Sequence, residues 1–203
     1  MAKTAKQVAA KLHHADKAAT HRAAQHRDTV PVRAAGLLAE LADQPQLIVA
    51  ALATVGAGVA TRRGDLVRGG ARMLAAHLAA TALKSAIKHR VDRTRPAHEL
   101  DGHPGTLRRG DSHDHQLNSF PSGHTAGAVA AARALSRDVE GAGVPATLAA
   151  GAVAAVQPIT GSHHFSDVLV GGIIGLVSEA VVSAVFDRVE PMIEQRLHRA
   201  LPA

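Results

Sequence analysis

Long runs without a charged residue are the feature that most limits how this chain can fold. Pro45 to Thr61 and Gly141 to Ser162 contain no charged side chain, and Val168 to Val185 contains only Glu179. These runs are too regular for loops, although a membrane span needs roughly 20 apolar residues and the first run is short and diluted with Ala and Gly. Small residues allow helices to pack closely, as in membrane bundles. We therefore expect apolar helices packed together, and we favour a membrane protein.

The rest of the chain also has a helical pattern. Leu66 to Ile87 has helical periodicity but carries Arg68, Arg72, His77 and Lys84, which have to face a bundle interior or an interface. Strand signals are weak, because β-branched alternation is scarce and no hairpin dipeptide separates such runs. We predict an all-α fold: a transmembrane bundle of about five or six core helices.

Composition sets limits on partners and on bound metals. The 203 residues suggest one domain, and the absence of Cys excludes disulfides and thiolate metal sites. A formal net charge of +6, with 14 His besides, favours anionic partners such as phosphate esters, acidic lipid surfaces or nucleic acid. Basic side chains that only solvate loops and helix ends would produce the same charge.

The N-terminal segment differs from the rest of the chain. Met1 to Asp28 is rich in Ala, with Lys, His and Arg interleaved, and it has no apolar run that would make it a secretory signal. It is either a basic helix on an anionic membrane or a frayed, solvated tail. We divide the chain into this helix or tail, residues 1–30, and a helical domain, residues 31–203.

A long polar segment interrupts the helical pattern between residues 97 and 118. Such loops are often functional, and this one holds four His residues and several Asp residues. Their spacings match no fixed set of metal ligands. We predict no metal site and no cofactor.

Three separated segments carry residues suited to a phosphate ester. Such an ester is a dianion, and breaking its P–O bond spreads charge over the equatorial oxygens. The site therefore needs cations, N–H donors, a nucleophile and an acid. Lys88 and Arg95 lie seven residues apart, and we expect both on one side of a helix that Pro96 ends. A basic helix end at an interface is the alternative.

The second segment, Phe120 to Thr125, reads FPSGHT and precedes a small-residue helix. Gly123 lets the backbone approach a ligand, and the Ser122 hydroxyl with the N–H groups of the helix start forms an anion site. His124 lies at the mouth of that site, where an acid that works at neutral pH is useful. The alternative is an ordinary helix cap with a chance His.

The third segment pairs His163 with Asp167 at positions i and i+4, which share a helix face if the turn is helical. A carboxylate on one ring nitrogen fixes the tautomer and leaves the other nitrogen free to attack. His164 competes for this role, but its i+4 partner is Val168. A His–Asp capping pair is the alternative.

In this order, the three segments resemble the phosphatidic acid phosphatase type 2 superfamily, which includes lipid phosphatases, acid phosphatases and vanadium haloperoxidases. The family pattern is K-x6-RP, then PSGH, then SR-x5-H-x3-D, and the resemblance covers about residues 45 to 186. The matching residues are Lys88, Arg95 and Pro96, then Pro121, Ser122, Gly123 and His124, then His163 and Asp167.

The resemblance implies that fold and a metal-independent hydrolysis of a phosphate monoester or diphosphate, typically lipid-linked. It implies that His163 attacks phosphorus to form a phosphohistidine, that Asp167 orients His163, and that His124 protonates the leaving alcohol. The residues that it assigns to the phosphoryl oxygens are Lys88, Arg95, Ser122 and Gly123, with Gln157 in a reduced role.

That reduced role reflects a departure from the pattern. The Arg of the third motif falls on Gln157 and the preceding Ser on Val156. In the family this Arg binds phosphate, and losing one transition-state donor costs on the order of 3 kcal/mol, about a hundredfold in rate. Gln157 can still donate hydrogen bonds, and Arg90, Arg93 and Arg137 are candidates for the missing charge.

We expect a phosphorylated lipid or another phosphate ester as the substrate and a membrane as partner, with no nucleic acid. The expected location is a bacterial-type inner membrane, crossed several times, with a soluble form as the alternative. Three other functions stay open. They are a family member that binds phosphorylated lipid without turnover, a soluble vanadate-type peroxidase, and a basic surface-binding protein that acts through Met1 to Asp28.

Overall fold

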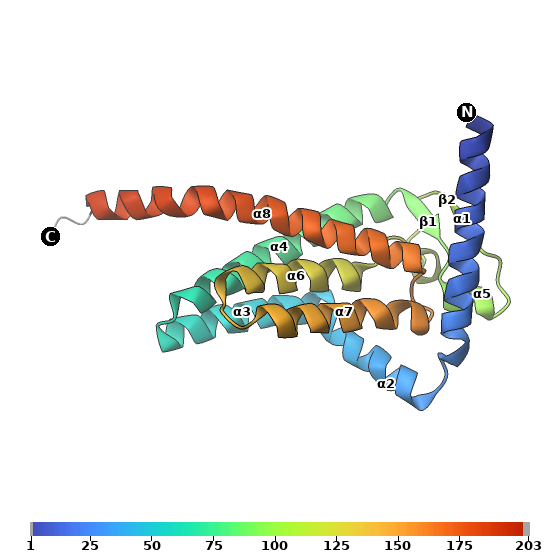
Figure 1. Cartoon of the computed structure of the whole chain (residues 1–203), viewed down its shortest axis with the longest axis horizontal. Helices are drawn as coiled ribbons and strands as arrows, with labels where there is room; N and C mark the ends of the chain where they lie inside the picture. The colour runs from blue at the N-terminus through green and yellow to red at the C-terminus, as the bar shows by residue number, and fades with distance from the viewer. Residues whose placement is uncertain (1, 201–203) are drawn as a thin grey trace.

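The computed structural model describes the backbone of residues 2–200, and all side chains there except those at 2–3, 5–6, 9, 190 and 193–200. It is a helical bundle with one small hairpin, which confirms the predicted all-α class (Figure 1). The elements in chain order are α1 (Ala2–Ala23), η1 (Ala24–His26), α2 (Val30–Ala39), η2 (Glu40–Ala42), α3 (Gln44–Thr61), α4 (Gly64–Lys88), β1 (Val91–Arg93), α5 (Pro96–Leu100), β2 (Leu107–Arg109), η3 (His115–Leu117), α6 (Gly123–Asp138), α7 (Gly143–Ile159) and α8 (Phe165–Ala200).

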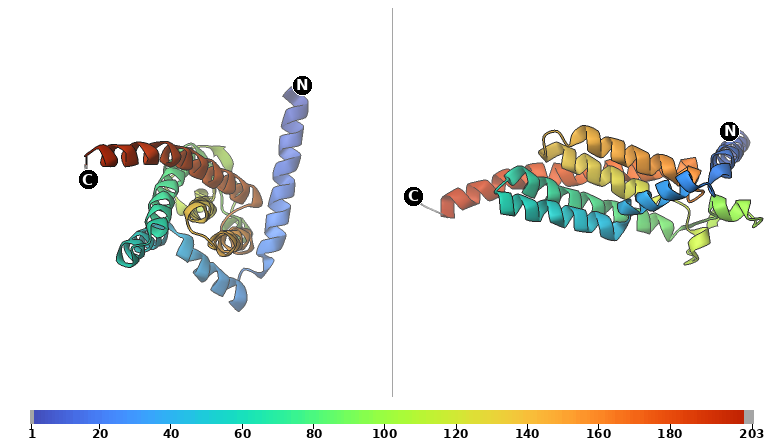
Figure 2. Two further views of the ribbon diagram at one scale, coloured as in Figure 1. Left: turned by 60° about the vertical axis from the view of Figure 1, so that its left-hand side comes forward. Right: turned by 90° about the horizontal axis from the view of Figure 1, so that it is seen from below.

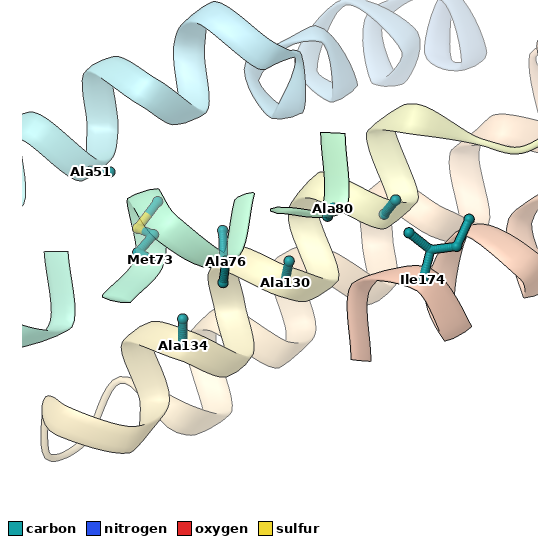
Figure 3. Close-up of a cluster of buried hydrophobic side chains, with 9 residues drawn as sticks. Ala51, Met73, Ala76, Ala80, Ala130, Ala134 and Ile174 are labelled. Carbon is teal, nitrogen blue, oxygen red and sulfur yellow. The ribbon is translucent and has the colours of Figure 1, made fainter. Parts of the chain in front are cut away.

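Helix α6 lies at the centre of the bundle and packs against α3, α4, α7 and α8 (Figure 2). Alanine dominates this packing: Ala76 and Ala80 of α4 meet Ala130 and Ala134 of α6, with Ile174 of α8 beside them (Figure 3). Side chains this small let the helix axes come close together, which is why the bundle needs so few aromatic residues.

Two charged residues that are buried in the bundle, Arg72 and Glu179, are paired, as their positions on otherwise apolar helices require. Arg72 of α4 is buried, and it donates from Nε to Asp138 at 2.8 Å and from Nη1 to Asp187 at 2.9 Å. Glu179 of α8 is also buried and accepts hydrogen bonds from Arg137 and Ser183. The prediction that the charges of α4 face an interior or an interface is therefore confirmed for Arg72.

Two stretches, Gln44–Thr61 and Phe165–Val189, are long and apolar enough to cross a membrane, and α7 is a shorter apolar helix. Most of the first two stretches is not buried by the rest of the protein. Large side chains such as Leu52 on α3 and Leu169 on α8 are 53% and 65% exposed. By length and composition, these helices give weak support to the predicted transmembrane arrangement.

Residues 89–95 are not helical, so the prediction of one helix face for Lys88 and Arg95 is wrong. Helix α4 ends at Lys88, and β1 pairs antiparallel with β2, Val91 opposite Arg109. Arg95 is extended, with φ −70° and ψ 143°, because a residue before proline disfavours the helical region. The 97–118 loop folds back as the second half of this hairpin.

Helix α1 crosses the end of the bundle where the hairpin and α5 lie (Figure 1). Its charges are bonded to those segments: Lys17 pairs with Glu99 at 2.9 Å, and Arg27, just beyond η1, donates to the Ala97 carbonyl at 3.1 Å. The second half of α1 and the residues after it are therefore attached to these segments, and the choice between a helix and a tail for the whole N-terminal segment stays a prediction. The division of the chain at residue 30 stays a prediction.

Candidate active site

The three predicted segments meet at the end of the bundle that α1 crosses. Lys88 ends α4, Arg95 precedes α5, and Gln157 lies in the last turn of α7. The remaining predicted residues are Ser122 at the cap of α6, Gly123 and His124 in its first turn, His163 in the α7–α8 loop, and Asp167 in the first turn of α8.

His163 is held as a neutral imidazole. It is buried, and its Nδ1 donates to the Ser119 carbonyl at 2.5 Å, which places the proton on Nδ1 and the lone pair on Nε2. Burial, and then the positive charges of Arg95 and Lys88, hold the pKa of His163 well below its ordinary value. The ring is therefore uncharged at neutral pH, with one nitrogen available as a nucleophile.

Asp167 does not contact the His163 ring as the sequence predicted. Helix α8 begins at Phe165, so His163 lies outside it, and His163 Nδ1 is 4.0 Å from Asp167 Oδ2, too far for a hydrogen bond. Asp167 Oδ2 instead accepts from Ser119 Oγ at 2.6 Å and from the His164 amide at 2.8 Å. Asp167 thus fixes Ser119, and the Ser119 carbonyl orients His163.

Arg93 links this arrangement to α1. Its Nη1 donates to Asp167 Oδ1 at 2.5 Å and to Ser166 Oγ at 2.6 Å, and its Nη2 donates to Asp16 Oδ2 at 2.8 Å. Because two carboxylates already neutralise it, Arg93 is not the missing phosphate cation. Ser119 and Asp16 were missed in the sequence, since only the fold brings them to Asp167.

Lys88 and Arg95 are bonded to carbonyl groups and remain available to an anion. Lys88 Nζ donates to the Asn118 carbonyl at 3.0 Å, and Arg95 Nη1 donates to the Ser162 carbonyl at 3.1 Å. Neither forms an ion pair with a residue that the structure describes. Burial, followed by repulsion from Arg95 and Lys84, lowers the pKa of Lys88 to about 8. Two cations without counter-ions beside a nucleophile suit a dianionic phosphate.

The start of α6 supplies N–H donors and the candidate acid. Ser122 caps the helix, because its Oγ accepts from the Thr125 amide at 3.4 Å and lies 3.0 Å from Thr125 Oγ1. The predicted cap alternative is therefore present, but Ser122 bonds only the Thr125 amide, so the amides of Gly123 and His124 have no acceptor among the described residues and remain available to an anion. His124 Nε2 has no hydrogen-bond partner among the described residues, and Glu40 Oε2 is 3.7 Å away.

A sequence model of the PAP2 superfamily matches residues 69–190, more than half of the chain. The chain belongs to the PAP2 superfamily. This confirms the resemblance inferred from the three motifs, all of which lie inside the matched range.

Two solved structures share the fold. LpxE of Aquifex aeolicus is 19% identical, with a TM-score of 0.57 over 81% of this chain and 92% of that one. A transmembrane PAP2 type phosphatidylglycerolphosphate phosphatase of Bacillus subtilis is also 19% identical, with a TM-score of 0.62 over 88% of each chain. A search of curated proteins found no significant match.

Gln157, at the position where the PAP2 pattern has an Arg, is buried and holds the loop that carries His163. Its backbone carbonyl accepts from the His163 amide at 3.2 Å and from the Ser162 amide at 3.1 Å. Its amide side chain adds no charge. Arg137 lies against Glu179, and Arg90 is exposed next to the hairpin. Arg137, like Arg93, is therefore already neutralised by a carboxylate and is not the missing cation.

Glu40, Asp43 and His124 form a group that could hold a metal ion. Their potential ligand atoms all lie within 4.8 Å of one another, and Glu40 is exposed. A metal bound there would occupy His124, which the PAP2 pattern assigns as the acid. A chelator such as EDTA therefore distinguishes His124 as a metal ligand from His124 as the acid of a metal-independent reaction.

Proposed function

We propose that this PAP2 protein hydrolyses a lipid-linked phosphate monoester or diphosphate through a phosphohistidine at His163. The observation that carries the proposal is the buried, neutral His163, whose Nδ1 proton is bound by a carbonyl while Lys88 and Arg95 lie without counter-ions beside it. Membership of the PAP2 superfamily and the likeness to the Bacillus subtilis phosphatase support the hydrolase class.

In this mechanism, Lys88, Arg95 and the N–H groups at the start of α6 bind the phosphoryl oxygens. His163 Nε2 attacks phosphorus, a P–N bond forms, and the bond to the leaving oxygen breaks as His124 donates a proton to that oxygen. His124 then takes a proton from a water molecule that attacks phosphorus. The P–N bond breaks, phosphate leaves, and His163 returns to its neutral form.

An apolar groove beside the site supports a lipid-linked substrate. The groove has a volume of about 470 Å³ and lies between α2, α3, α4, α6 and α7. Its lining includes Val156, which directly precedes Gln157, and Ala42, which directly precedes Asp43. A hydrocarbon chain of the substrate fits an apolar groove of this kind, with its phosphate at the neighbouring cations.

The outer faces of α3 and α8 support a membrane location, crossed several times. Apolar helices in the core of a soluble protein are buried, whereas these two stretches expose most of their length. The membrane phosphatase of Bacillus subtilis with the same fold supports the same location. In such an arrangement, the site lies at one end of the bundle, near the level of the lipid headgroups.

Phosphate release tests this proposal. Purified protein in detergent with EDTA is given a panel of lipid phosphates and soluble phosphate esters, and wild type is compared with His163→Ala and Gln157→Arg. We expect release from wild type with EDTA present, none from His163→Ala, and the highest rates on lipid substrates. Loss of release in EDTA would contradict the metal-independent mechanism and point to the Glu40, Asp43 and His124 group.

Gln157 favours one second candidate, a member that binds phosphorylated lipid without turnover. It predicts lipid-phosphate binding that His163→Ala leaves intact and no phosphate release from wild type. Release that appears only in Gln157→Arg would support this binding role over the phosphatase.

A further inference from the structure

A second lysine of α4 reaches the candidate site. Lys84 lies one helical turn before Lys88, so both side chains leave the same face of the helix. Its side chain passes over Gly123: a Cβ atom at Gly123 would lie 3.0 Å from Lys84 Nζ and 3.3 Å from Lys84 Cδ. The room left by this glycine is thus filled by a lysine, which brings the ammonium group to the first turn of α6, beside the cap at Ser122.

The charge of Lys84 has no bonded partner. The side chain is half-buried, and it forms no hydrogen bond or ion pair with any residue that the structure describes. The positive charge of Lys84 acts on Lys88, while Asp43 is the carboxylate whose charge acts on Lys84. The Asp43 charge acts on both lysines but is bonded to neither, so holding them close together is unfavourable, and a bound dianion reduces that cost.

We infer that Lys84 binds the phosphoryl group and supplies the third positive charge, which the PAP2 pattern takes from an Arg at the position of Gln157. The inference rests on the proposed phosphatase function. Lys88 lies at the end of α4 and Arg95 directly precedes α5, while Lys84 reaches from α4 to the first turn of α6. The three cations then surround an anion that the N–H groups of α6 also face.

Activity of charge variants tests this role. Lys84→Met is expected to lower kcat/KM about a hundredfold, as loss of one transition-state donor does. Lys84→Arg keeps the charge and is expected to keep most of the activity. The double variant Lys84→Met/Gln157→Arg is expected to recover activity, because it returns the charge to the position used in the family. Lys11→Met is the matched control, since Lys11 is exposed on α1.

Binding of orthovanadate, a phosphate analogue, provides a readout that does not need turnover. We expect Lys84→Met to weaken orthovanadate binding at least about tenfold while Lys11→Met leaves it unchanged. Wild-type kcat/KM and wild-type orthovanadate affinity in Lys84→Met would overturn the inference and leave the phosphatase proposal standing.

Two further outcomes separate the claims. If wild type releases no phosphate, the proposed function fails, and Lys84 is judged by orthovanadate alone: weaker binding in Lys84→Met supports the inference, and unchanged binding overturns it. A loss in Lys84→Met that Lys84→Arg shares and Gln157→Arg does not restore would also overturn it, because the loss would then not follow the charge.

Discussion

At the scale of single residues, the site is built from groups whose charge states differ from their ordinary ones. His163 is neutral because it is buried beside cations, and Lys88 is a weaker base than a free lysine for the same reasons. In the proposed mechanism, His163 therefore needs no separate base to deprotonate it before it attacks phosphorus. The charge of Lys88, in contrast, is lost as the pH rises through about 8.

If Lys88 binds the phosphoryl group as proposed, we expect it to set an alkaline limit for activity. Its pKa is lowered to about 8, so the side chain is charged below that pH and becomes neutral above it. Because kcat/KM reports the ionisations of the free enzyme, it should fall as the pH rises through about 8. A bound dianion stabilises the charged lysine, so the corresponding fall in kcat should lie at higher pH.

Lys88→Arg tests this assignment in a pH profile of phosphate release. Arginine stays charged, so we expect its alkaline fall in kcat/KM to move to higher pH even if its absolute rate is lower. Lys11→Arg, on the exposed face of α1, should keep the wild-type profile. Identical alkaline falls in wild type and Lys88→Arg would show that another group sets this limit.

At the scale of elements, α1 is part of the support of the site. Asp16 of α1 accepts from Arg93 Nη2, from Ser166 Oγ and from the Ser166 amide, and Arg93 in turn holds Asp167. Burial raises the pKa of Asp16, but the hydrogen bonds from Ser166 and Arg93 lower it by more, so the net shift is downward. A chain of charged contacts therefore runs from the N-terminal helix to the group that orients His163.

Asp16→Asn should loosen this support. It removes the charge opposite a buried guanidinium, and a hydrogen bond to a charged group is worth about 2 kcal/mol of unfolding free energy. We expect a lower Tm in detergent and a lower kcat with little change in KM, because Asp16 does not touch the substrate. Asp28→Asn, whose carboxylate is 90% exposed, is the matched control.

The loss of Tm in Asp16→Asn should depend on pH in a direction that the pKa of Asp16 determines. The pKa of Asp16 is lower in the folded protein than its ordinary value of 3.8. The stabilisation is therefore fully present above that value and disappears as the pH falls through the lowered folded-state pKa. The difference in Tm between wild type and Asp16→Asn should shrink only below pH 3.8. A constant difference across the acid range would exclude a charge effect.

At the scale of the whole molecule, the sequence predicted the helices better than the connections between them. Uncharged runs and helical periodicity predicted the bundle and its buried charges such as Arg72. The three motifs predicted the family and which segments meet. The hairpin was missed, because its strands have three residues each and pair across a loop.

The residues of the site likewise divide into those that the sequence predicted and those that it did not. The motif residues could be predicted because their spacing is local, whereas Ser119, Asp16 and Lys84 reach the site only through contacts with segments distant in the sequence. The orientation of His163 by a backbone carbonyl leaves no trace in a pattern of side chains. For the same reason, the predicted bond from Asp167 to His163 was reasonable from the spacing but does not form.

Trapping the phosphorylated enzyme tests the central claim most directly. Wild type is mixed with substrate, quenched in alkaline denaturant in which phosphohistidine survives, digested, and analysed by mass spectrometry, with His163→Ala alongside. We predict one phosphoryl group on His163 during turnover and none in His163→Ala. Continued phosphate release with His163 unmodified, or a phosphoryl group carried by His164 instead, would contradict the mechanism.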